Sequence, residues 1–227
     1  MTVAAVIFDW GGTLTPWHGI DVQGLWGCIC EPHFPADQVA THAAALHLAE
    51  RELWEISATE HRSATMSQVF ALAGVPASPA LLATYNRAWA PHTYTDPDVA
   101  DLLGYLRAQD IRIGVLSNTM WPREWHEDIF RRDGVLDLID GAVYTSEIDW
   151  TKPHPEAFVA AMKAIGVSDP GDCVFVGDRP FDDVHGAHSV GMRTVLIPHS
   201  DVPAYEVAVP DAVISRLAEL RPLIESW

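Results

Sequence analysis

Short apolar segments rich in β-branched residues recur along the chain, and each is bounded by glycine, aspartate, serine or proline. They are residues 3–8, 111–116, 142–144, 174–176, 194–197 and 212–214. Continuous apolar runs of this length are typical of strands buried on both faces. Amphipathic helical patterns follow the later segments, over residues 99–109, 125–132, 155–165, 183–190 and 217–224. This alternation predicts right-handed βαβ crossovers and an α/β fold built on a parallel sheet.

One interval departs from the alternation. From about residue 16 to residue 92 the pattern is helical throughout, with its longest stretch over residues 36–57. We therefore predict a core formed by residues 1–15 and 93–227, with a helical cap inserted at 16–92. Loops that leave the carboxyl ends of parallel strands are where open α/β sheets bind ligands. An insertion at this point is expected to act as a lid.

Composition narrows the classes of partner. The chain has 227 residues, of which 48% are hydrophobic, and 14 Lys plus Arg against 31 Asp plus Glu give a net charge of -17. The lysines are Lys152 and Lys163 alone, and this acidic balance argues against nucleic acid or an anionic membrane as partner. No run resembles a signal peptide or a membrane span, and three cysteines give no disulfide framework. We expect a cytoplasmic protein; no pattern in the chain defines an oligomeric state.

Cys28, Cys30 and His33 are close enough in sequence to be considered as metal ligands. A structural metal site needs a second pair of ligands, which this segment lacks. The two cysteines are therefore expected to be small buried apolar side chains.

Polar residues follow several of the predicted strands. Asp9 ends the first strand, Ser117 and Asn118 end the second, and Asp178 ends the fourth, with Asp183 shortly after. These positions meet at one edge of a parallel sheet. Carboxylates gathered at one point repel one another unless a cation lies between them, so the acidic group predicts a hard divalent ion such as Mg²⁺.

Two further groups suit an anionic ligand beside this ion. The Ser117 hydroxyl is a donor, and the amides that follow it, such as that of Asn118, point into the same space. Lys152 brings a positive charge from the next loop. Together they predict a binding site for a phosphoryl group, with the Asp9 carboxylate as the nucleophile that attacks it.

The motifs in this order resemble those of the haloacid dehalogenase superfamily of hydrolases. They are Asp9-Trp10-Gly11-Gly12-Thr13-Leu14, Leu116-Ser117-Asn118, Lys152-Pro153-His154-Pro155-Glu156, and Gly177-Asp178 with Asp182-Asp183. The resemblance implies a Rossmann-like core with a helical cap after the first motif. It also implies a phosphatase that forms an aspartyl-phosphate on Asp9 and acts on a small phosphorylated metabolite.

The resemblance further implies roles for individual residues. Mg²⁺ would be held by Asp9, the Gly11 carbonyl and Asp178, with Asp183 at the second acidic position of the fourth motif. Ser117 and Lys152 would bind the phosphoryl oxygens. Substrate contacts are expected from residues in or near the first two motifs, namely Trp10, Gly12, Thr13, His18 and Asn118.

The residue at position 11 departs from the family pattern. Phosphatases of the family usually carry a second aspartate there, which protonates the departing oxygen and then activates the hydrolytic water, and this chain has Gly11. Loss of a positioned general acid costs typically about 10²–10⁴-fold in rate. One interpretation is a substrate with a good leaving group, such as an acyl or aryl phosphate. Another is a proton supplied from elsewhere, and His18 is the first candidate.

Other chemistries remain as alternatives. The first motif resembles that of phosphonoacetaldehyde hydrolases, but these enzymes need a cap lysine, and no lysine precedes Lys152. Hydrolytic dehalogenases of the family work without a metal, so retention of Asp178 and Asp183 argues against dehalogenation. The remaining alternative is a protein that binds a phosphorylated ligand, or is regulated by it, with little catalysis.

Overall fold

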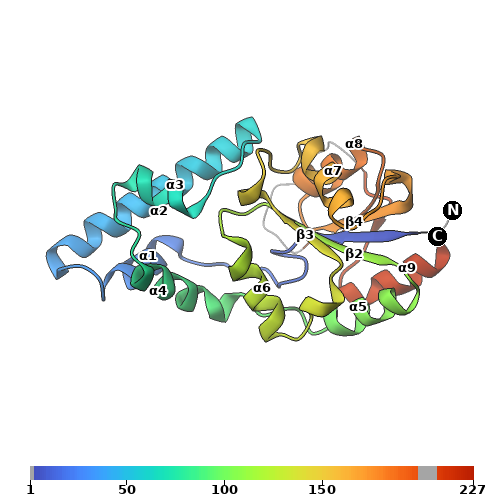
Figure 1. Ribbon diagram of the computed structural model, residues 1–227, viewed down its shortest axis with the longest axis horizontal. Helices are drawn as coiled ribbons and strands as arrows, with labels where there is room; N and C mark the ends of the chain where they lie inside the picture. The colour runs from blue at the N-terminus through green and yellow to red at the C-terminus, as the bar shows by residue number, and fades with distance from the viewer. Residues whose placement is uncertain (1–2, 199–208) are drawn as a thin grey trace.

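The computed structural model describes residues 3–198 and 209–227 (Figure 1). Within these residues a single sheet contains six strands, all parallel, in the order β3-β2-β1-β4-β5-β6. The strands are β1 (Ala5–Phe8), β2 (Arg112–Ser117), β3 (Gly141–Tyr144), β4 (Cys173–Gly177), β5 (Arg193–Leu196) and β6 (Ala212–Val213). The predicted α/β class and parallel sheet are confirmed, and each predicted strand lies within about two residues of an observed one.

Helices account for most of the remaining described chain. Those before β2 are α1 (Val22–Cys30), α2 (Ala36–Glu60), α3 (Met66–Ala73), α4 (Pro79–Trp89) and α5 (Val99–Ala108). Those after it are α6 (Arg123–Arg132), α7 (Pro155–Ala164), α8 (Gly186–Ser189) and α9 (Leu220–Ser226). None of the helices in the described ranges is long and apolar enough to cross a bilayer.

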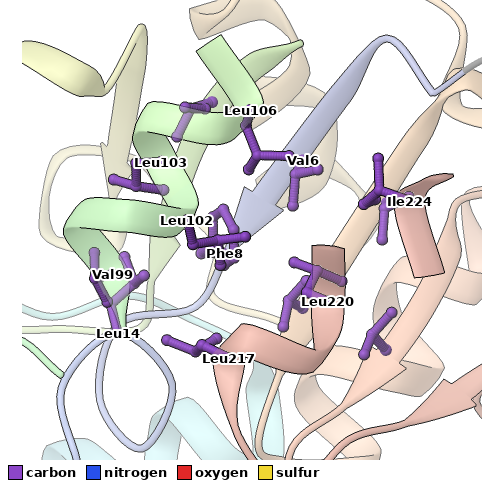
Figure 2. Packing of buried hydrophobic residues seen from close by; sticks show 14 of the residues in the cluster. Val6, Phe8, Leu14, Val99, Leu102, Leu103, Leu106, Leu217, Leu220 and Ile224 are labelled. Carbon is purple, nitrogen blue, oxygen red and sulfur yellow. The ribbon is translucent and has the colours of Figure 1, made fainter. Parts of the chain in front are cut away.

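The central strand β1 is buried on both faces because each face is covered by helices. Val6 and Phe8 point to the side where α5 and α9 pack, as Figure 2 shows. Ala5 and Ile7 point to the opposite side and contact the cluster that includes Phe158 of α7. The alternation of side chains along a strand explains this division. The result is a three-layer core that holds the end of β1 in a defined place.

Helices α1 to α4 follow β1 and form a separate group beside the sheet (Figure 1). They enclose a hydrophobic cluster of their own, which includes Trp26, Leu46 and Phe70. Local signals set the helix ends: Thr65 forms a capping box at the start of α3, and Gly74 ends that helix with a positive φ of 65°. The division into a core and a cap at residues 15/16 and 92/93 remains a prediction.

The segment after β4 differs from the expected α-helix at residues 183–190. Residues Pro180–His185 form a π-helical turn, and α-helical geometry is confined to Gly186–Ser189. The Asp183 carboxylate accepts a hydrogen bond from the backbone N–H of Arg179 (2.9 Å) and is fully buried. The wider turn therefore carries Asp183 inward to the sheet edge, an arrangement common where π-turns occur at functional sites.

Candidate active site

Asp9 lies at the carboxyl end of the central strand. Its backbone N–H continues the sheet by donating to the Val176 carbonyl (2.9 Å), and the chain then turns sharply. Gly12 takes a φ of 89° in this turn, where its N–H donates to the Thr15 carbonyl (2.7 Å). Few residues other than glycine adopt this backbone conformation readily. The turn directs the Asp9 side chain away from the core and into the space beyond the sheet edge.

Two glycines allow the carboxylates of neighbouring segments to approach. A Cβ atom on Gly12 would lie 2.4 Å from Oδ2 of Asp178, and one on Gly177 would lie 2.3 Å from Cγ of Asp183. Both separations are far below van der Waals contact. Glycine is therefore required at both positions by the close carboxylates, and at Gly12 also by the backbone conformation.

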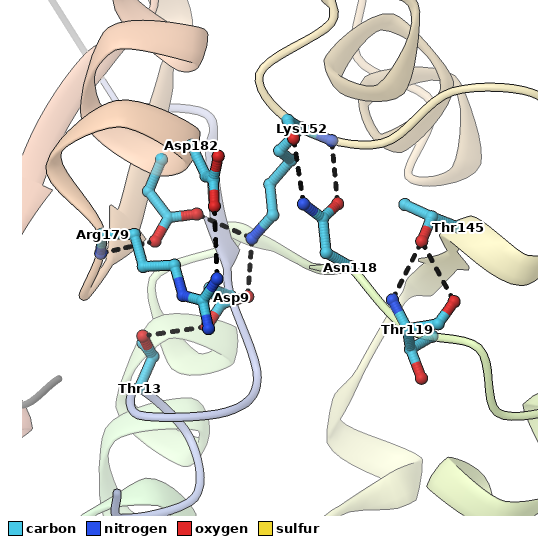
Figure 3. Close-up of polar contacts among 9 residues, drawn as sticks. Asp9, Thr13, Asn118, Thr119, Thr145, Lys152, Arg179 and Asp182 are labelled. Carbon is cyan, nitrogen blue, oxygen red and sulfur yellow. Dashed lines mark hydrogen bonds and ion pairs between the residues drawn. The ribbon is translucent and has the colours of Figure 1, made fainter. Parts of the chain in front are cut away.

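Three buried carboxylates and one lysine meet at this edge, and Figure 3 shows Lys152 beside one of them, Asp9. Asp9, Asp178 and Asp183 each offer an oxygen within 4.8 Å of the others. Lys152 Nζ donates to Oδ1 of Asp9 (2.6 Å) and to Oδ1 of Asp183 (2.7 Å). The Thr13 hydroxyl donates to the other Asp9 oxygen (3.3 Å). With the carboxylates ionised, three negative charges face one lysine, and the group carries a net charge of about -2.

The electrostatics of the group keep Lys152 charged. Burial alone lowers the pKa of Lys152, but attraction by Asp183 and Asp9 outweighs burial and raises it above its usual range. Burial raises the pKa of Asp183, although the charge of Lys152 opposes this effect. A buried ammonium between two carboxylates is thus a permanent feature of the site near neutral pH.

The second strand supplies Ser117 and Asn118. Ser117 is buried and lines the same cavity as Asp9. The Asn118 carboxamide is tied to the lysine loop: its Nδ2 donates to the Lys152 carbonyl (3.0 Å) and its Oδ1 accepts from the Lys152 N–H (2.8 Å). The side chain of Asn118 therefore positions Lys152, a role that its place at a strand end did not indicate.

Arg179 is a charged residue of the site that the sequence analysis missed. It follows Asp178 directly and lines the cavity, with Nη1 3.4 Å from Oδ2 of Asp182 (Figure 3). Burial lowers the pKa of Arg179, but Asp182 and Asp178 outweigh it and raise the pKa. Its position next to a strand-ending carboxylate was the signal that could have identified it.

A cavity of about 520 Å³ opens in front of Asp9. Predicted site residues that line it are Asp9, Trp10, Gly11, Gly12, His18, Ser117, Asn118 and Lys152. Thr13 contacts Asp9 instead of the cavity, and Asp178 and Asp183 stand beside Asp9 in the carboxylate group. A Cβ atom added to Gly11 would meet no atom within 4 Å, so this position has room for a side chain.

Part of the cavity is formed by residues that lie outside the four motifs. Several come from the helical segment, namely Glu50, Trp54, Tyr85, Trp89 and His92. The i, i+4 spacing of Tyr85 and Trp89 on α4 places their rings on one side of that helix and was the available signal.

A scan of family models matches residues 3–191 to the haloacid dehalogenase-like hydrolases. The chain belongs to this family. Its membership explains why the four motifs converge on one sheet edge, and the resemblance inferred from them is confirmed.

Curated relatives of this haloacid dehalogenase-like hydrolase are phosphatases by name. A glyceraldehyde 3-phosphate phosphatase of Methanopyrus kandleri is 33% identical over 132 residues, 56% of this chain and 55% of the relative. The human N-acylneuraminate-9-phosphatase is 31% identical over 137 residues, 60% of this chain and 54% of the relative. The chain thus aligns with about half the length of the curated relatives that it matches.

Solved structures share the fold over nearly the whole chain. A haloacid dehalogenase-type phosphatase from Thermococcus onnurineus superposes with a TM-score of 0.69 at 24% identity, covering 99% of this chain and 98% of that one. The L-2-haloacid dehalogenase from Xanthobacter autotrophicus gives 0.66 at 21% identity, covering 99% of each chain. Both branches of chemistry are therefore built on this architecture.

The cysteines of this hydrolase stand apart from the site. Cys30 is buried as expected, but Cys28 is exposed, so the prediction that both are buried was wrong for Cys28. His33 instead hydrogen-bonds through Nε2 with the Thr84 hydroxyl (2.8 Å). In the described part of the chain, one set of three or more histidine, cysteine or acidic side chains is close enough together to hold a metal. It consists of Asp9, Asp178 and Asp183.

Proposed function

We propose that this protein is a Mg²⁺-dependent phosphatase that transfers a phosphoryl group to Asp9. The observation that carries the proposal is the Asp9 carboxylate, held by Lys152 Nζ (2.6 Å) and the Thr13 hydroxyl (3.3 Å) at the end of an open cavity. A carboxylate positioned by two donors and facing a ligand space is suited to attack on phosphorus. Curated relatives named as phosphatases support the same reaction class.

The residues present fit a divalent cation. Asp9 and Asp178 supply carboxylate oxygens, and Asp183 is the third acidic member of the group. The excess of about two negative charges over Lys152 matches the charge of Mg²⁺, which prefers oxygen ligands. The Gly11 carbonyl is the proposed backbone ligand. When bound, Mg²⁺ would shield the phosphate charge from the attacking carboxylate.

The other groups of the site act on the phosphoryl oxygens. Lys152 is charged and fully buried, so its attraction to developing negative charge is weakly screened. Ser117 offers a hydroxyl from the end of β2. We assign both to binding and stabilising the transferred group, while Asn118 keeps the lysine loop against β2 through two hydrogen bonds.

Gly11 restricts the substrates that this site can process well. No carboxyl group stands at the position from which relatives protonate the leaving group. A substrate whose leaving group is already a weak base, such as an acyl or aryl phosphate, needs little protonation. His18 lines the same cavity and remains the candidate proton donor for other substrates.

The test is release of inorganic phosphate with and without Mg²⁺. We expect turnover of acetyl phosphate and p-nitrophenyl phosphate that is lost on adding EDTA and restored by excess Mg²⁺. Sugar phosphates should react more slowly. Equal rates on both classes, or activity that survives EDTA, would contradict the proposal.

The contribution of His18 needs a test of its own. If it donates the proton, His18→Ala should remove one limb of the pH–rate profile for a sugar phosphate. An unchanged profile would eliminate it as the proton source.

The vacancy at Gly11 favours one alternative, a protein that binds a phosphorylated ligand and scarcely turns it over. Beryllium fluoride, which mimics a phosphoryl group on aspartate, tests whether Asp9 can carry that group, and acetyl phosphate separates the two functions. A phosphatase should release phosphate from acetyl phosphate. Stable modification of Asp9 by acetyl phosphate without phosphate release would favour the regulatory function.

A further inference from the structure

Aromatic rings line much of the cavity and are here called the ring wall. Two come from the predicted core and four from the interval 16–92, and these lining residues are Trp10, Trp121, Trp17, Trp54, Tyr85 and Trp89. Trp54 and Trp17 are partly exposed, at 37% and 40%, so their faces are available to a ligand. A phosphorylated molecule seated on Asp9 would extend its leaving group along this wall.

Four of these rings, those of Trp10, Trp121, Tyr85 and Trp89, contact one another. Trp10, beside the nucleophile, lies 5.5 Å from Trp121 between ring centroids, and Trp121 lies 5.4 Å from Trp89. Trp121 Nε1 also donates to the Tyr85 hydroxyl (2.9 Å). Side chains already held in place lose little conformational entropy when a ligand binds. The wall is thus preorganised to contact a flat apolar group.

Some of the polar groups that line the cavity already have partners. The Glu50 carboxylate accepts a hydrogen bond from Trp26 Nε1 (2.8 Å), and the Thr93 hydroxyl donates to the Ala90 carbonyl (3.1 Å). Among the described residues, Nε1 of Trp10 and Nδ1 of His47 have no partner, and a single polar substituent on the ligand could satisfy either of them. The chemistry of the wall favours burial of ring carbon.

The vacancy at Gly11 independently favours the same class of substrate. A phenol has a pKa of about 10, whereas an aliphatic alcohol is a far weaker acid, so an aryl oxide departs with less need of a proton. The ring wall would contact the ring of the leaving group, whereas the absent general acid would act on its oxygen. An aryl phosphate fits both features.

We infer that the ligand of this cavity is an aryl phosphate, with its ring against Trp10, Trp89 and Trp54. The inference rests on the proposed phosphatase function. An Asp9 oxygen bonds to phosphorus as the bond from phosphorus to the aryl oxygen breaks, and the aryl oxide leaves with the electron pair. Water then cleaves the aspartyl-phosphate, giving phosphate and free Asp9, and a proton from that water neutralises the aryl oxide.

Binding of stable analogues tests ring recognition without depending on catalysis. Benzylphosphonate, cyclohexylmethylphosphonate and propylphosphonate would each be titrated calorimetrically into the Mg²⁺-supplemented protein. We expect benzylphosphonate to bind about tenfold more tightly than propylphosphonate, with the saturated ring between them. Equal affinities for the benzyl and propyl compounds would overturn the inference.

Substitutions of the lining tryptophans test which rings cause the preference for the benzyl compound. Trp89→Leu and Trp54→Leu should each lower the ratio of benzyl to propyl affinity by about fivefold. Leu48→Ala is the matched control, because Leu48 is an exposed residue of α2 that does not line the cavity. If Trp89→Leu fails to fold, Trp54→Leu still decides, since its side chain is partly exposed. A ratio unchanged in the folded wall variants would overturn the assignment.

Turnover separates this inference from the proposed function. Phenyl phosphate should exceed glyceraldehyde 3-phosphate in kcat/KM by about 10²-fold or more. Its ring would contact the lining tryptophans, and its leaving group departs with less need of a proton. Hydrolysis of acetyl phosphate, with no preference for phenyl phosphate over glyceraldehyde 3-phosphate, would overturn the inference. The proposed phosphatase function would remain supported. Tight binding of benzylphosphonate with no hydrolysis of any ester would support ring recognition and overturn the phosphatase.

Discussion

The two ends of the cavity are built in different ways. At the sheet edge, Lys152 touches Asp9 and Asp183 at 2.6 and 2.7 Å, and each group is placed by a strand end or by the loop beside it. At the helical end, rings such as Trp89 and Trp121 meet at a centroid distance of 5.4 Å. Charged groups must be placed to within tenths of an ångström, whereas ring contacts tolerate wider separations.

The difference indicates which end performs which part of the function. Under the proposed function, the charged end on the parallel sheet would perform the reaction, and the aromatic end would contact the part of the substrate that varies. Substitutions at the first end should therefore affect rate or stability strongly. Substitutions at the second should alter selectivity.

The largest expected effect is at Asp9, the proposed nucleophile. Asp9→Asn removes the attacking oxygen but preserves the size of the side chain, and turnover should fall by about 10⁴-fold or more. Initial rates of phosphate release from acetyl phosphate measure this. Asp101→Asn is the matched control, because it makes the same chemical change at an exposed position of α5 that does not line the cavity. Activity that survives Asp9→Asn would refute the assignment of the nucleophile.

Lys152→Met tests whether the charged end is held by one buried cation. The substitution leaves Asp9 and Asp183 buried without their partner, and the free energy of unfolding should fall by about 3–5 kcal/mol. Urea unfolding with and without Mg²⁺ measures the loss, and Mg²⁺ should restore part of it. Lys163→Met, at an exposed position of α7, should change stability by less than about 0.5 kcal/mol. Equal losses in the two variants would contradict this account.

Gly11→Asp tests whether the vacancy limits the chemistry. The position has no atom within 4 Å of a Cβ, so the new side chain should fit. A carboxyl group there should raise kcat for a poor leaving group such as glyceraldehyde 3-phosphate by about 10²-fold. Gly11→Ala adds a side chain without an acid and should give no gain. Equal rates for the two variants would show that protonation is not limiting.

The smallest expected effect concerns His126, which is fully buried between the two ends. Its ring lies 4.5 Å from that of Trp10, and burial, with repulsion from Arg123, lowers the pKa of His126 to about 3. The unfolded chain binds this proton below about pH 6.5, whereas the folded protein does not until about pH 3. Stability contributed by neutral His126 is therefore present above about pH 6.5 and is lost as pH falls toward 3.

Between about pH 7 and pH 5 this linkage amounts to about 2 kcal/mol. His126→Gln should reduce the pH dependence of the unfolding free energy by that amount, measured by urea titration at each pH. His188→Gln, at an exposed position of α8, is the control and should leave the slope unchanged. A slope that is identical in wild type and His126→Gln would contradict the prediction.

The charged end of the site could be predicted from the chain because it depends on local pattern. Apolar runs ending in Asp9, Ser117 and Asp178 predict parallel strands whose carboxyl ends share one edge, and the structure brings these residues to one site. The helix expected from residue 183 was the exception. There the chain forms a π-turn over Pro180–His185, and the buried Asp183 carboxylate accepts a hydrogen bond from the Arg179 backbone N–H.

Sequence alone determined the α/β architecture, the helical insertion pattern and the identity of the charged groups, since periodicity and strand-end position are properties of neighbouring residues. Only the tertiary structure decided that Asn118 holds the lysine loop, that Arg179 faces the cavity, and that rings from α2 and α4 wall it. These contacts join segments tens of residues apart. Their partners are chosen by the packing of whole helices against the sheet, which no local pattern encodes.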